Sequence, residues 1–279
     1  MDPSLDLPPL NVSALLRTHQ LFPKKSLGQN FLMDPSALKR VVEAAQIEPG
    51  QDVLEIGPGL GSLTRYLALA ARRVTAVEID PHLIPVLQEV LTPFDNVSIL
   101  HNDILEVNLD EALKDGSATY QVVANIPYYI TSAVIRHLLE AGRKPQRLVL
   151  TIQREVAERI CARSGVHSLL SLSVHVYGKP SISTRIPAGA FYPVPNVDSS
   201  VLRVDLYSQP LIPEEQLNSF FRLAKAGFGQ KRKTLRNALS AGLSWPAERT
   251  LALLTAGDID PQRRAETLSM DEWKTLTER

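Results

Sequence analysis

Short apolar runs alternate with longer amphipathic segments along the first three quarters of the chain. Each run has the length of a buried strand, and the segments between the early runs are long enough to form helices. A strand–helix repeat of this kind is typical of parallel sheets, because a parallel connection must cross from one end of the sheet to the other. The pattern predicts an α/β fold with a doubly wound, seven-stranded and mainly parallel sheet. We place the strands at residues 52–56, 74–79, 97–100, 120–124, 148–152, 172–177 and 200–206.

The pattern changes in the last quarter of the chain, where apolar residues recur at helical spacing. The proline-containing stretch 208–213 serves as a linker into this part. The last two predicted strands have no helix-length segment between them and should form an antiparallel hairpin. We expect an N-terminal tail (1–20), a sheet domain (21–208) and a small all-α domain (209–279). The predicted C-terminal helices are 214–228, 230–241, 247–256 and 270–278.

A glycine-rich turn follows the first strand, and an acid lies near the end of the second. Gly57-Pro58-Gly59-Leu-Gly61 separates a strand from a helix, and Glu78 follows about 20 residues later, as in folds that bind an adenosine cofactor. The Glu78 carboxylate can accept hydrogen bonds from both ribose hydroxyls. The spacing is Gly-x-Gly-x-Gly, and Pro58 removes a backbone N–H that a pyrophosphate would use. These residues favour S-adenosylmethionine over a dinucleotide.

A third polar residue follows the strand at 97–100. Asp103 is placed to reach the adenine amino group of such a cofactor, because the carboxyl ends of neighbouring parallel strands meet at one edge of a sheet. An Asp after a strand is equally typical of a turn or a helix cap. From the sequence, both interpretations of Asp103 stay open.

The most informative segment, Asn125-Ile126-Pro127-Tyr128, comes directly after the strand at 120–124. The exocyclic amine of adenine or cytosine is a poor nucleophile, since its lone pair is delocalised into the ring. The Asn125 side-chain oxygen and the Ile126 carbonyl are suitable acceptors for its N–H groups. Pro127 stiffens the turn, and Tyr128 offers a face to an unstacked base. Alone, Asn-x-Pro-Tyr is more often an ordinary turn; the preceding cofactor pattern makes it a candidate site of amine methylation.

Charge is balanced over the whole chain but uneven within it. Lys plus Arg and Asp plus Glu both number 30, which argues against a protein that coats nucleic acid indiscriminately. Residues 216–247 nevertheless contain no acid, and the basic residues there suit the phosphates of a folded RNA. For Arg222 and Lys225 a solvated helix face is an equal alternative. The RNA-binding candidates are Lys24, Lys25, Lys231, Arg232, Lys233 and Arg236.

Five motifs occur in a fixed order between residues 24 and 237. They are Lys24-Lys25-Ser-Leu-Gly28-Gln29-Asn30-Phe31-Leu32, Glu55-Ile-Gly57-Pro-Gly59-Leu-Gly61, Asn125-Ile-Pro-Tyr128, Phe191-Tyr-Pro193-Val-Pro195-Asn-Val-Asp198-Ser199 and Gln230-Lys-Arg-Lys-Thr-Leu-Arg236-Asn237. Together they resemble the ribosomal small-subunit (16S) rRNA adenine N6,N6-dimethyltransferase family. The resemblance covers nearly the whole chain beyond its first residues.

The resemblance implies a Rossmann-like, S-adenosylmethionine-dependent methyltransferase with a C-terminal domain that contacts RNA. Such enzymes dimethylate N6 of two adjacent adenosines in a hairpin near the 3′ end of 16S rRNA, during biogenesis of the small subunit. Phe191 would face Tyr128 across the target base, although a Phe before Tyr-Pro is otherwise a routine core or turn aromatic. The implied catalytic residues are Asn125, Ile126, Pro127, Tyr128 and Phe191. The implied cofactor-binding residues are Asn30, Leu32, Gly57, Glu78, Asp103 and Asn125.

Two other functions fit part of the pattern. A DNA adenine N6-methyltransferase would share Asn-x-Pro-Tyr but explains the C-terminal basic motif less well. A ribosome-assembly factor would bind immature small subunits as a checkpoint, and its catalysis would be secondary. If such a factor only bound, it would be expected to have lost Glu78 or Asn125, and both are present.

Several common signals are missing from the sequence. Cys161 is the only cysteine, and the six histidines show no metal-ligand spacing, so we expect no disulfide within the chain and no metal. There is no signal-peptide pattern and no apolar run of membrane-spanning length. We expect a cytoplasmic protein, monomeric by default, whose partner is rRNA within the immature small ribosomal subunit.

Overall fold

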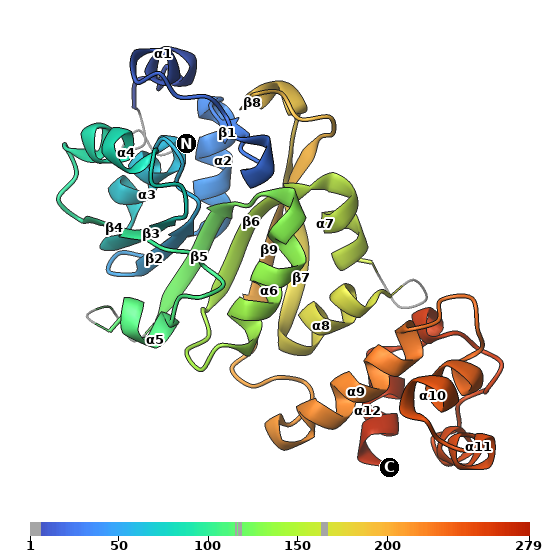
Figure 1. The fold of residues 1–279 in the computed structure, drawn as a ribbon. Helices are drawn as coiled ribbons and strands as arrows, with labels where there is room; N and C mark the ends of the chain where they lie inside the picture. Colours follow the sequence, from blue (N-terminus) through green and yellow to red (C-terminus); the bar gives the residue numbers. More distant parts are fainter. Residues whose placement is uncertain (1–6, 115, 117–118, 163–166) are drawn as a thin grey trace. The chain divides into compact units, whose positions relative to one another are not determined.

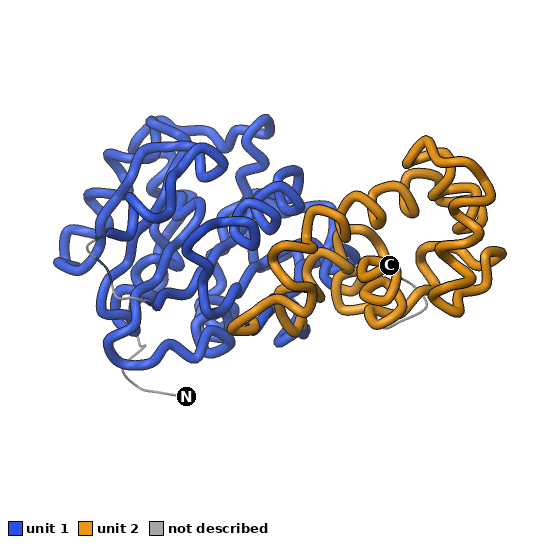
Figure 2. The backbone as a smooth tube through the Cα atoms, turned by 90° about the horizontal axis from the view of Figure 1, so that it is seen from below, with its two compact units in different colours: residues 1–157, 181–206 blue, residues 158–180, 207–279 orange. Residues whose placement is uncertain are grey.

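The computed structural model describes residues 7–114, 116, 119–162 and 167–279, and it divides into two compact units. Unit 1 comprises Met1–Ala157 and Ser181–Leu206, and unit 2 comprises Glu158–Pro180 and Tyr207–Arg279 (Figure 2). The segment 158–180, which the sequence pattern places in the sheet domain, therefore clusters with the C-terminal helices. A single boundary drawn along the sequence misses this, because the chain visits unit 2 twice.

A seven-stranded sheet forms the centre of the fold, as predicted (Figure 1). The strand order is β4-β3-β2-β5-β6-β9-β7. The four pairings from β4 to β6 are parallel, whereas β9 runs antiparallel to β6. The strands are β2 (Asp52–Ile56), β3 (Arg73–Glu78), β4 (Val97–His101), β5 (Tyr120–Asn125), β6 (Arg147–Gln153), β7 (Gly178–Ile186) and β9 (Ser199–Leu206).

Helices cover both faces of this sheet (Figure 1). On one face α2 and α3 pack into an apolar cluster with buried strand residues such as Val53 and Val123, and α6 lies over the opposite face. The chain order of these helices between strands is what a doubly wound sheet requires. The helices are α2 (Pro35–Ala45), α3 (Ser62–Ala70), α4 (Ile84–Leu91), α5 (Leu109–Ala112), α6 (Thr131–Glu140) and α7 (Arg154–Ile160).

Part of the expected N-terminal tail is helical. Residues 1–6 lie outside the described residues, and α1 (Val12–Thr18) follows them. Asn11 caps this helix by accepting a hydrogen bond from the Ala14 backbone N–H. Val12 and Leu16 are buried in a cluster that includes Leu60 of the glycine loop. Apolar burial therefore anchors this short helix, which would be marginal in isolation.

The strand predicted at residues 172–177 is wrong, because these residues belong to helix α8 (Leu169–Tyr177). The run is rich in β-branched and large apolar residues, which favour strands when propensity alone decides. Here Ser168 caps the helix, its side chain accepting from the Ser171 backbone N–H, and α8 packs against helices α9 and α12 of unit 2. Tertiary packing overrides the local preference. The sheet neighbour of β9 is instead β7, which begins at Gly178.

Unit 2 is helical, as predicted for the C-terminal part. Trp273 is fully buried and stacks on Phe228 with 5.8 Å between ring centroids. A Cβ on Gly227 would lie 2.8 Å from the Trp273 ring, so glycine permits this close approach. The second predicted helix starts later than expected, at Leu235. The helices are α9 (Leu217–Phe228), α10 (Leu235–Leu243), α11 (Ala247–Ala256) and α12 (Met270–Glu278).

Candidate active site

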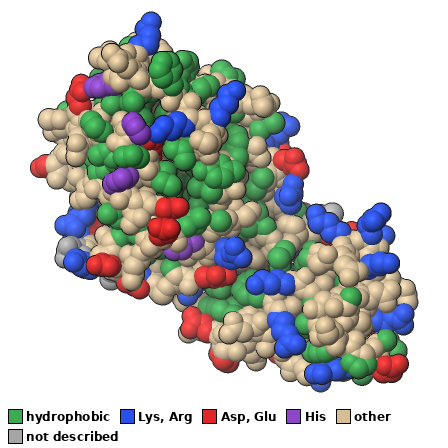
Figure 3. Space-filling view, in the orientation of Figure 1, with side chains coloured by type: hydrophobic (Ala, Val, Ile, Leu, Met, Phe, Trp, Pro, Cys, Tyr) green, Lys and Arg blue, Asp and Glu red, His purple; other side chains and the backbone are tan. Residues whose placement is uncertain are grey.

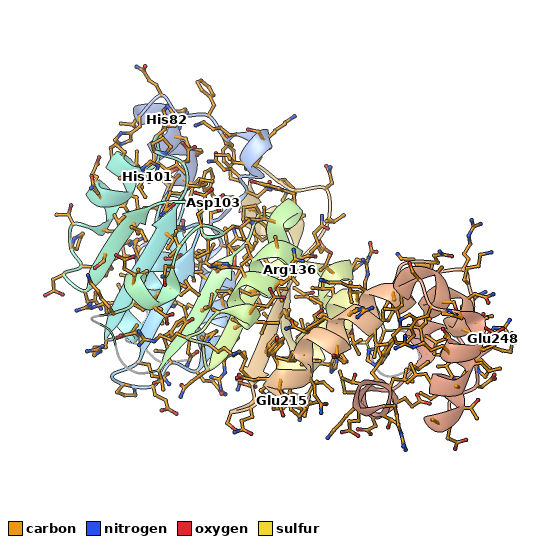
Figure 4. All side chains as sticks on the ribbon, turned by 60° about the horizontal axis from the view of Figure 1, so that its bottom comes forward. His82, His101, Asp103, Arg136, Glu215 and Glu248 are labelled. Carbon is orange, nitrogen blue, oxygen red and sulfur yellow. The ribbon has the colours of Figure 1, made fainter. Side chains whose placement is uncertain are left out.

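The carboxyl ends of four neighbouring parallel strands border one cavity in unit 1. Gly57 and Gly59 follow β2, Glu78 ends β3, Asp103 follows β4 and Asn125 ends β5, and all five line the cavity. Asp103 is labelled in Figure 4. These strands are adjacent in the order β4-β3-β2-β5, so residues far apart in sequence converge where an open α/β sheet binds its ligand.

The glycine loop leaves room for a ligand to approach its backbone. Gly57, Gly59 and Gly61 all adopt left-handed conformations, with φ of 67°, 59° and 83°, which only glycine adopts without strain. A Cβ on Gly57 would meet nothing nearer than the Asn125 backbone oxygen, at 3.9 Å. A Cβ on Gly59 would lie 2.9 Å from the Phe31 ring. The space beside Gly57 is therefore open, while Gly59 is needed for packing against the N-terminal segment.

Glu78 is held rigidly at the end of β3. Its side chain is buried, with Oε2 accepting from the Gly59 backbone N–H at 3.0 Å and Oε1 from the Asp80 backbone N–H at 2.8 Å. Burial raises the pKa of Glu78, and hydrogen bonds from the backbone of Asp80, Gly59 and Ile79 oppose this rise. A carboxylate can accept about four hydrogen bonds, so acceptor capacity remains for a hydroxyl group of a ligand. This arrangement fits a hydroxyl of a ribose.

Asp103 serves a turn and also lines the cavity. Its Oδ1 accepts from the Leu105 backbone N–H at 2.9 Å, which is the turn interaction that the sequence allows. The residue also borders the cavity, together with the apolar Ile79 and Ile104. The sequence interpretation did not single out these two isoleucines, although each directly follows a candidate acid. Their side chains suit the two faces of a flat, apolar ring whose polar edge meets Asp103.

Asn125 is oriented by the N-terminal segment. Its Nδ2 donates to the Asn30 backbone oxygen at 2.9 Å, so the side-chain oxygen Oδ1 is the atom that remains to accept hydrogen bonds in the cavity. Asn30 also lines the cavity, and its own Nδ2 donates to the Gly28 backbone oxygen at 3.1 Å. The structure thus brings Asn30 and Asn125 together and assigns the acceptor role to Asn125 Oδ1.

The residues after Asn125 form a fixed turn. Ile126 is buried, and its backbone N–H donates to the Thr151 backbone oxygen at 3.2 Å. Pro127, with φ of −54°, precedes the short helix η3 (Tyr128–Ile130). The Tyr128 hydroxyl is 2.8 Å from Ser199 Oγ, and burial raises the pKa of this phenol. Tyr128 therefore stays neutral at physiological pH and presents its ring to the cavity.

Phe191 and Leu32 lie in the core beside this site. They pair across the two-stranded sheet of β1 (Phe31–Leu32) and β8 (Phe191–Tyr192), and their exposed fractions are 1% and 3%. Neither borders the cavity, whereas Phe31 does. The exposed aromatic near the turn is Tyr129, which is 62% exposed and lines the cavity. Sequence reasoning missed Tyr129, although it directly follows Tyr128.

A hydrogen-bond network ties the N-terminal segment to β3. Asp80 is 2% exposed and accepts from Lys24 Nζ at 2.8 Å and from Gln29 Nε2 at 2.9 Å. Gln29 Oε1 in turn accepts from the Lys24 backbone N–H. Although burial alone would raise it, the pKa of Asp80 is lowered to about 2 by the hydrogen bonds from Lys24, Gln29 and His82. Asp80 was not singled out from the sequence. Lys24 is thus engaged within unit 1, while Lys25 is exposed.

The four C-terminal basic candidates lie on unit 2. Lys231, Arg232 and Lys233 are exposed between α9 and α10, and Arg236 is half-buried in α10. Within the described ranges, none of the four forms an ion pair with a carboxylate. Lys and Arg side chains are visible over much of this unit in Figure 3. These cations are available to phosphates.

Fold and site together define a class of protein. A doubly wound sheet carries, at its carboxyl edge, an acid for a ribose, a glycine loop with open space beside it, and an oriented amide acceptor after β5. These features fit S-adenosylmethionine. Glu78 would bind its ribose, Asp103 would bind its adenine, and the backbone of Gly57 would lie beside its methionine end. The class is that of the S-adenosylmethionine-dependent methyltransferases with a Rossmann-like domain.

Comparison with known proteins specifies the family. Residues 22–279 match the family model described as ribosomal RNA adenine dimethylase, and the chain belongs to this family. The ribosomal RNA small subunit methyltransferase A of Dehalococcoides mccartyi (strain CBDB1) is 45% identical over 262 residues, covering 94% of this chain and 90% of that protein. The protein of the same name from Moorella thermoacetica is 41% identical over 273 residues, covering 95% and 94%. The resemblance inferred from the five motifs is confirmed.

Two solved structures agree with the fold. The 23S rRNA methyltransferase ErmE is 29% identical, with a TM-score of 0.71, covering 89% of this chain and 98% of that one. A dimethyladenosine transferase from Plasmodium falciparum is 24% identical, with a TM-score of 0.76, covering 88% and 95%. The predicted methyltransferase fold is confirmed. Of the helices in the described part of the chain, none has the length and apolar character of a membrane span.

Proposed function

We propose that the protein uses S-adenosylmethionine to dimethylate N6 of two adjacent adenosines in a hairpin near the 3′ end of 16S rRNA. The observation that carries this proposal is the orientation of Asn125. Its amide nitrogen donates a hydrogen bond to the Asn30 carbonyl, so its oxygen can accept a hydrogen bond in the cavity that Glu78 also lines. The curated relatives, which are named as methyltransferases of the ribosomal small subunit, support the substrate class.

The chain's own residues would activate the target amine. When bound, S-adenosylmethionine supplies an activated methyl electrophile. Asn125 Oδ1 and the Ile126 carbonyl would accept the two N–H groups of the adenine N6, which draws this nitrogen towards a tetrahedral, nucleophilic geometry. Tyr128 would stack on the base and fix its distance from the cofactor. Most of the rate enhancement then comes from proximity and alignment.

The reaction needs no strong general base. Once methylated, the N6 nitrogen carries a positive charge and loses its proton readily to water. The hydroxyl of Tyr128 is not suited to accept it, because burial raises the pKa of this phenol and so keeps it protonated, and its oxygen is already hydrogen-bonded with Ser199. Tyr128 is therefore assigned to stacking. Phe191 would reach the second face of the base only if β8 moved, because in this structure it belongs to the core.

We propose that the partner is rRNA within the immature small subunit. We also propose that the protein is cytoplasmic and monomeric. The cations that would contact phosphates form no ion pair with a carboxylate among the residues that the structure describes. They are Lys25, Lys231, Arg232, Lys233 and Arg236. Lys24 is expected to act mainly through Asp80, which it contacts. We also propose that the helical segment 209–279 supplies the RNA-contacting surface.

The test is methyl transfer from labelled S-adenosylmethionine to small subunits that lack the modification, followed by digestion to nucleosides. The wild type should yield N6,N6-dimethyladenosine. Asn125→Ala should lower the rate by about two to three orders of magnitude, the range for removing one preorganised catalytic hydrogen-bond group. Asn218→Ala, an exposed asparagine on α9, is the matched control and should keep the wild-type rate.

Other outcomes would select the rival functions. Tight binding of the particle without label in the RNA would favour an assembly checkpoint factor. Label on DNA alone would establish a DNA adenine methyltransferase. Equal activity of wild type and Asn125→Ala would refute the role that we assign to the Asn125 oxygen.

A further inference from the structure

A second cavity lies entirely within unit 2. Residues of α9, α10, α11 and α12 surround it, together with the turn between α10 and α11. Leu223, Leu243 and Leu276 form an apolar floor and are at most 8% exposed. The described residues that line this cavity include three arginines and no Asp or Glu. The cavity therefore combines an apolar interior with a positively charged rim.

Trp245 stands at this rim on a rigid turn. Ser244 ends α10 in a left-handed conformation with φ of 54°, and the Trp245 backbone N–H donates to the Ser240 backbone oxygen at 3.0 Å. Pro246 follows and caps α11. Hydrogen bonding on one side and a proline on the other restrict the backbone of Trp245. An aromatic ring held this way loses little entropy when it binds a ligand.

Two of the arginines contact the indole ring. The guanidinium carbon of Arg249 lies 4.1 Å from the ring centroid of Trp245, and that of Arg222 lies 6.0 Å from it. Both side chains are exposed, and within the described ranges neither pairs with a carboxylate. Arg279 adds a third guanidinium at the same cavity. The rim therefore combines one indole ring with three guanidinium groups.

We propose that this cavity binds one unstacked nucleotide of the rRNA. Its base would pack against Trp245 and the guanidinium plane of Arg249, and the flanking phosphates would contact Arg222 and Arg279. Proteins recognise unpaired bases by stacking on aromatic and guanidinium planes, and arginine binds phosphate with paired donors. This inference rests on the proposed function in one respect, namely that the polymer bound is RNA.

The lining favours a nucleotide over an acidic peptide. A bound peptide would bring backbone N–H and C=O groups that need hydrogen-bond partners. Apart from the arginines and the Trp245 ring nitrogen, the only polar side chains on the described lining are the hydroxyls of Ser219 and Thr277. A base on an aromatic platform needs few such partners. The acidic peptide is therefore the alternative against which the cavity is tested.

Tryptophan fluorescence reports on this cavity directly. The chain contains two tryptophans, and Trp273 is fully buried, so a ligand at the cavity should quench the emission of Trp245 alone. The full-length protein is titrated with a short single-stranded oligoadenylate, with a duplex RNA of equal charge, and with inorganic phosphate. The single-stranded RNA should quench the emission saturably, and Trp245→Leu should abolish this change. Thermal unfolding by circular dichroism checks that the variant is folded.

Affinity, measured by the anisotropy of a labelled oligoadenylate, supplies the second readout. Arg249→Gln should weaken binding roughly 10-fold, as expected for loss of one stacked, charged contact. Lys274→Gln removes the same charge from an exposed position on α12 that does not line the cavity, and it should stay within about two-fold of the wild type.

The outcomes separate this inference from the proposed function. RNA binding without any change in Trp245 emission, or equal weakening by Arg249→Gln and Lys274→Gln, would overturn the nucleotide site while leaving methylation untouched. Quenching by phosphate alone at the same concentration would reduce the cavity to an anion site and overturn base recognition. Saturable quenching by a Glu- and Leu-rich peptide but not by oligoadenylate would assign the cavity to a protein partner. Absence of methyl transfer to small subunits would refute the proposed function without bearing on this titration.

Discussion

The two units differ in how their charged side chains are paired. In unit 1 Glu78 at the cavity and the nearby Asp80 are buried and hydrogen-bonded, Glu78 to the Gly59 backbone and Asp80 to Lys24. In unit 2 the cations of the segment 231–236 have no carboxylate partner in the described structure. The difference matches the two tasks that we propose. Aligning an amine with a methyl donor requires groups fixed in advance, whereas binding RNA phosphates requires cations that can displace the counterions of the RNA.

The first prediction concerns the ionisation of Glu55, a buried carboxyl of unit 1. Glu55 is 1% exposed, and burial raises its pKa to about 8. A carboxyl with a raised pKa in the folded state stabilises the fold fully below pH 4.5, its unfolded value, and this stabilisation is lost as the pH rises through 8. Between these limits the wild type should lose about 4 kcal/mol from this group. Glu55→Gln, neutral at every pH, should not.

Urea unfolding from pH 4.5 to pH 8 measures this difference, over the window set by the pKa of Glu55. The stability of Glu55→Gln relative to the wild type should increase steadily with pH. Glu43→Gln, an exposed glutamate on α2, is the control and should run parallel to the wild type. Parallel curves for Glu55→Gln as well would mean that Glu55 is ionised in the fold.

The second prediction concerns Glu78, which we propose binds the ribose of the cofactor. Glu78→Gln replaces an acceptor that already holds two backbone N–H groups by an amide with one acceptor and one donor. Hydrogen bonds to a charged group contribute about 1.5–3 kcal/mol, so the affinity for S-adenosylhomocysteine should fall roughly 10- to 100-fold. Calorimetric titration measures it. The exposed Glu106→Gln should bind normally, and normal binding by Glu78→Gln would remove Glu78 from the cofactor site.

The third prediction concerns Asp80, whose pKa is lowered to about 2 from 3.8. A carboxyl with a lowered pKa stabilises the fold above its unfolded pKa, and this stabilisation is lost as the pH falls through the folded value. Asp80→Asn should therefore cost about 2 kcal/mol at neutral pH. The difference from the wild type should vanish near pH 2, the folded value. Urea unfolding checks this, and Asp95→Asn, at an exposed position before β4, should change little at any pH.

The smallest effect is expected in unit 2. Arg232→Gln removes one unpaired cation, so the slope of log affinity for rRNA against log salt concentration should fall by about 1. Arg263→Gln removes an arginine that pairs with Glu272, and it should lower stability while leaving that slope unchanged. Filter binding at several salt concentrations measures both variants. Equal changes of this slope in the two variants would contradict the distinction between paired and unpaired cations in unit 2.

The strand ends of unit 1 were predictable from the sequence because they depend on local signals. A parallel sheet collects the carboxyl ends of its strands at one edge, so Gly57, Glu78, Asp103 and Asn125 converge once the strands are recognised. The glycines require left-handed backbone, and that requirement is visible in the residue type itself. These are properties of short segments and of one general rule of topology.

The contacts between distant segments were not predictable in the same way. The helix at 169–177 looks like a strand because its residues favour strands, and only packing against α9 and α12 decides otherwise. The hydrogen bond from the Asn125 side chain to the Asn30 carbonyl joins residues 95 positions apart. No local pattern shows which amide atom of Asn125 is engaged, and that choice determines the acceptor in the cavity.

The sequence by itself therefore determined the class of fold, the family and most of the residues that meet at the carboxyl edge of the sheet, because apolar periodicity, glycine conformation and motif order are local properties. The tertiary structure decided which groups are fixed and which are free. In the folded chain Phe191 is buried and Lys24 donates a hydrogen bond to Asp80. Arg222, Trp245 and Arg249 line one cavity. The physical reason is that burial and pairing depend on residues distant in the chain, and these set the hydrogen bonding and pKa of each side chain.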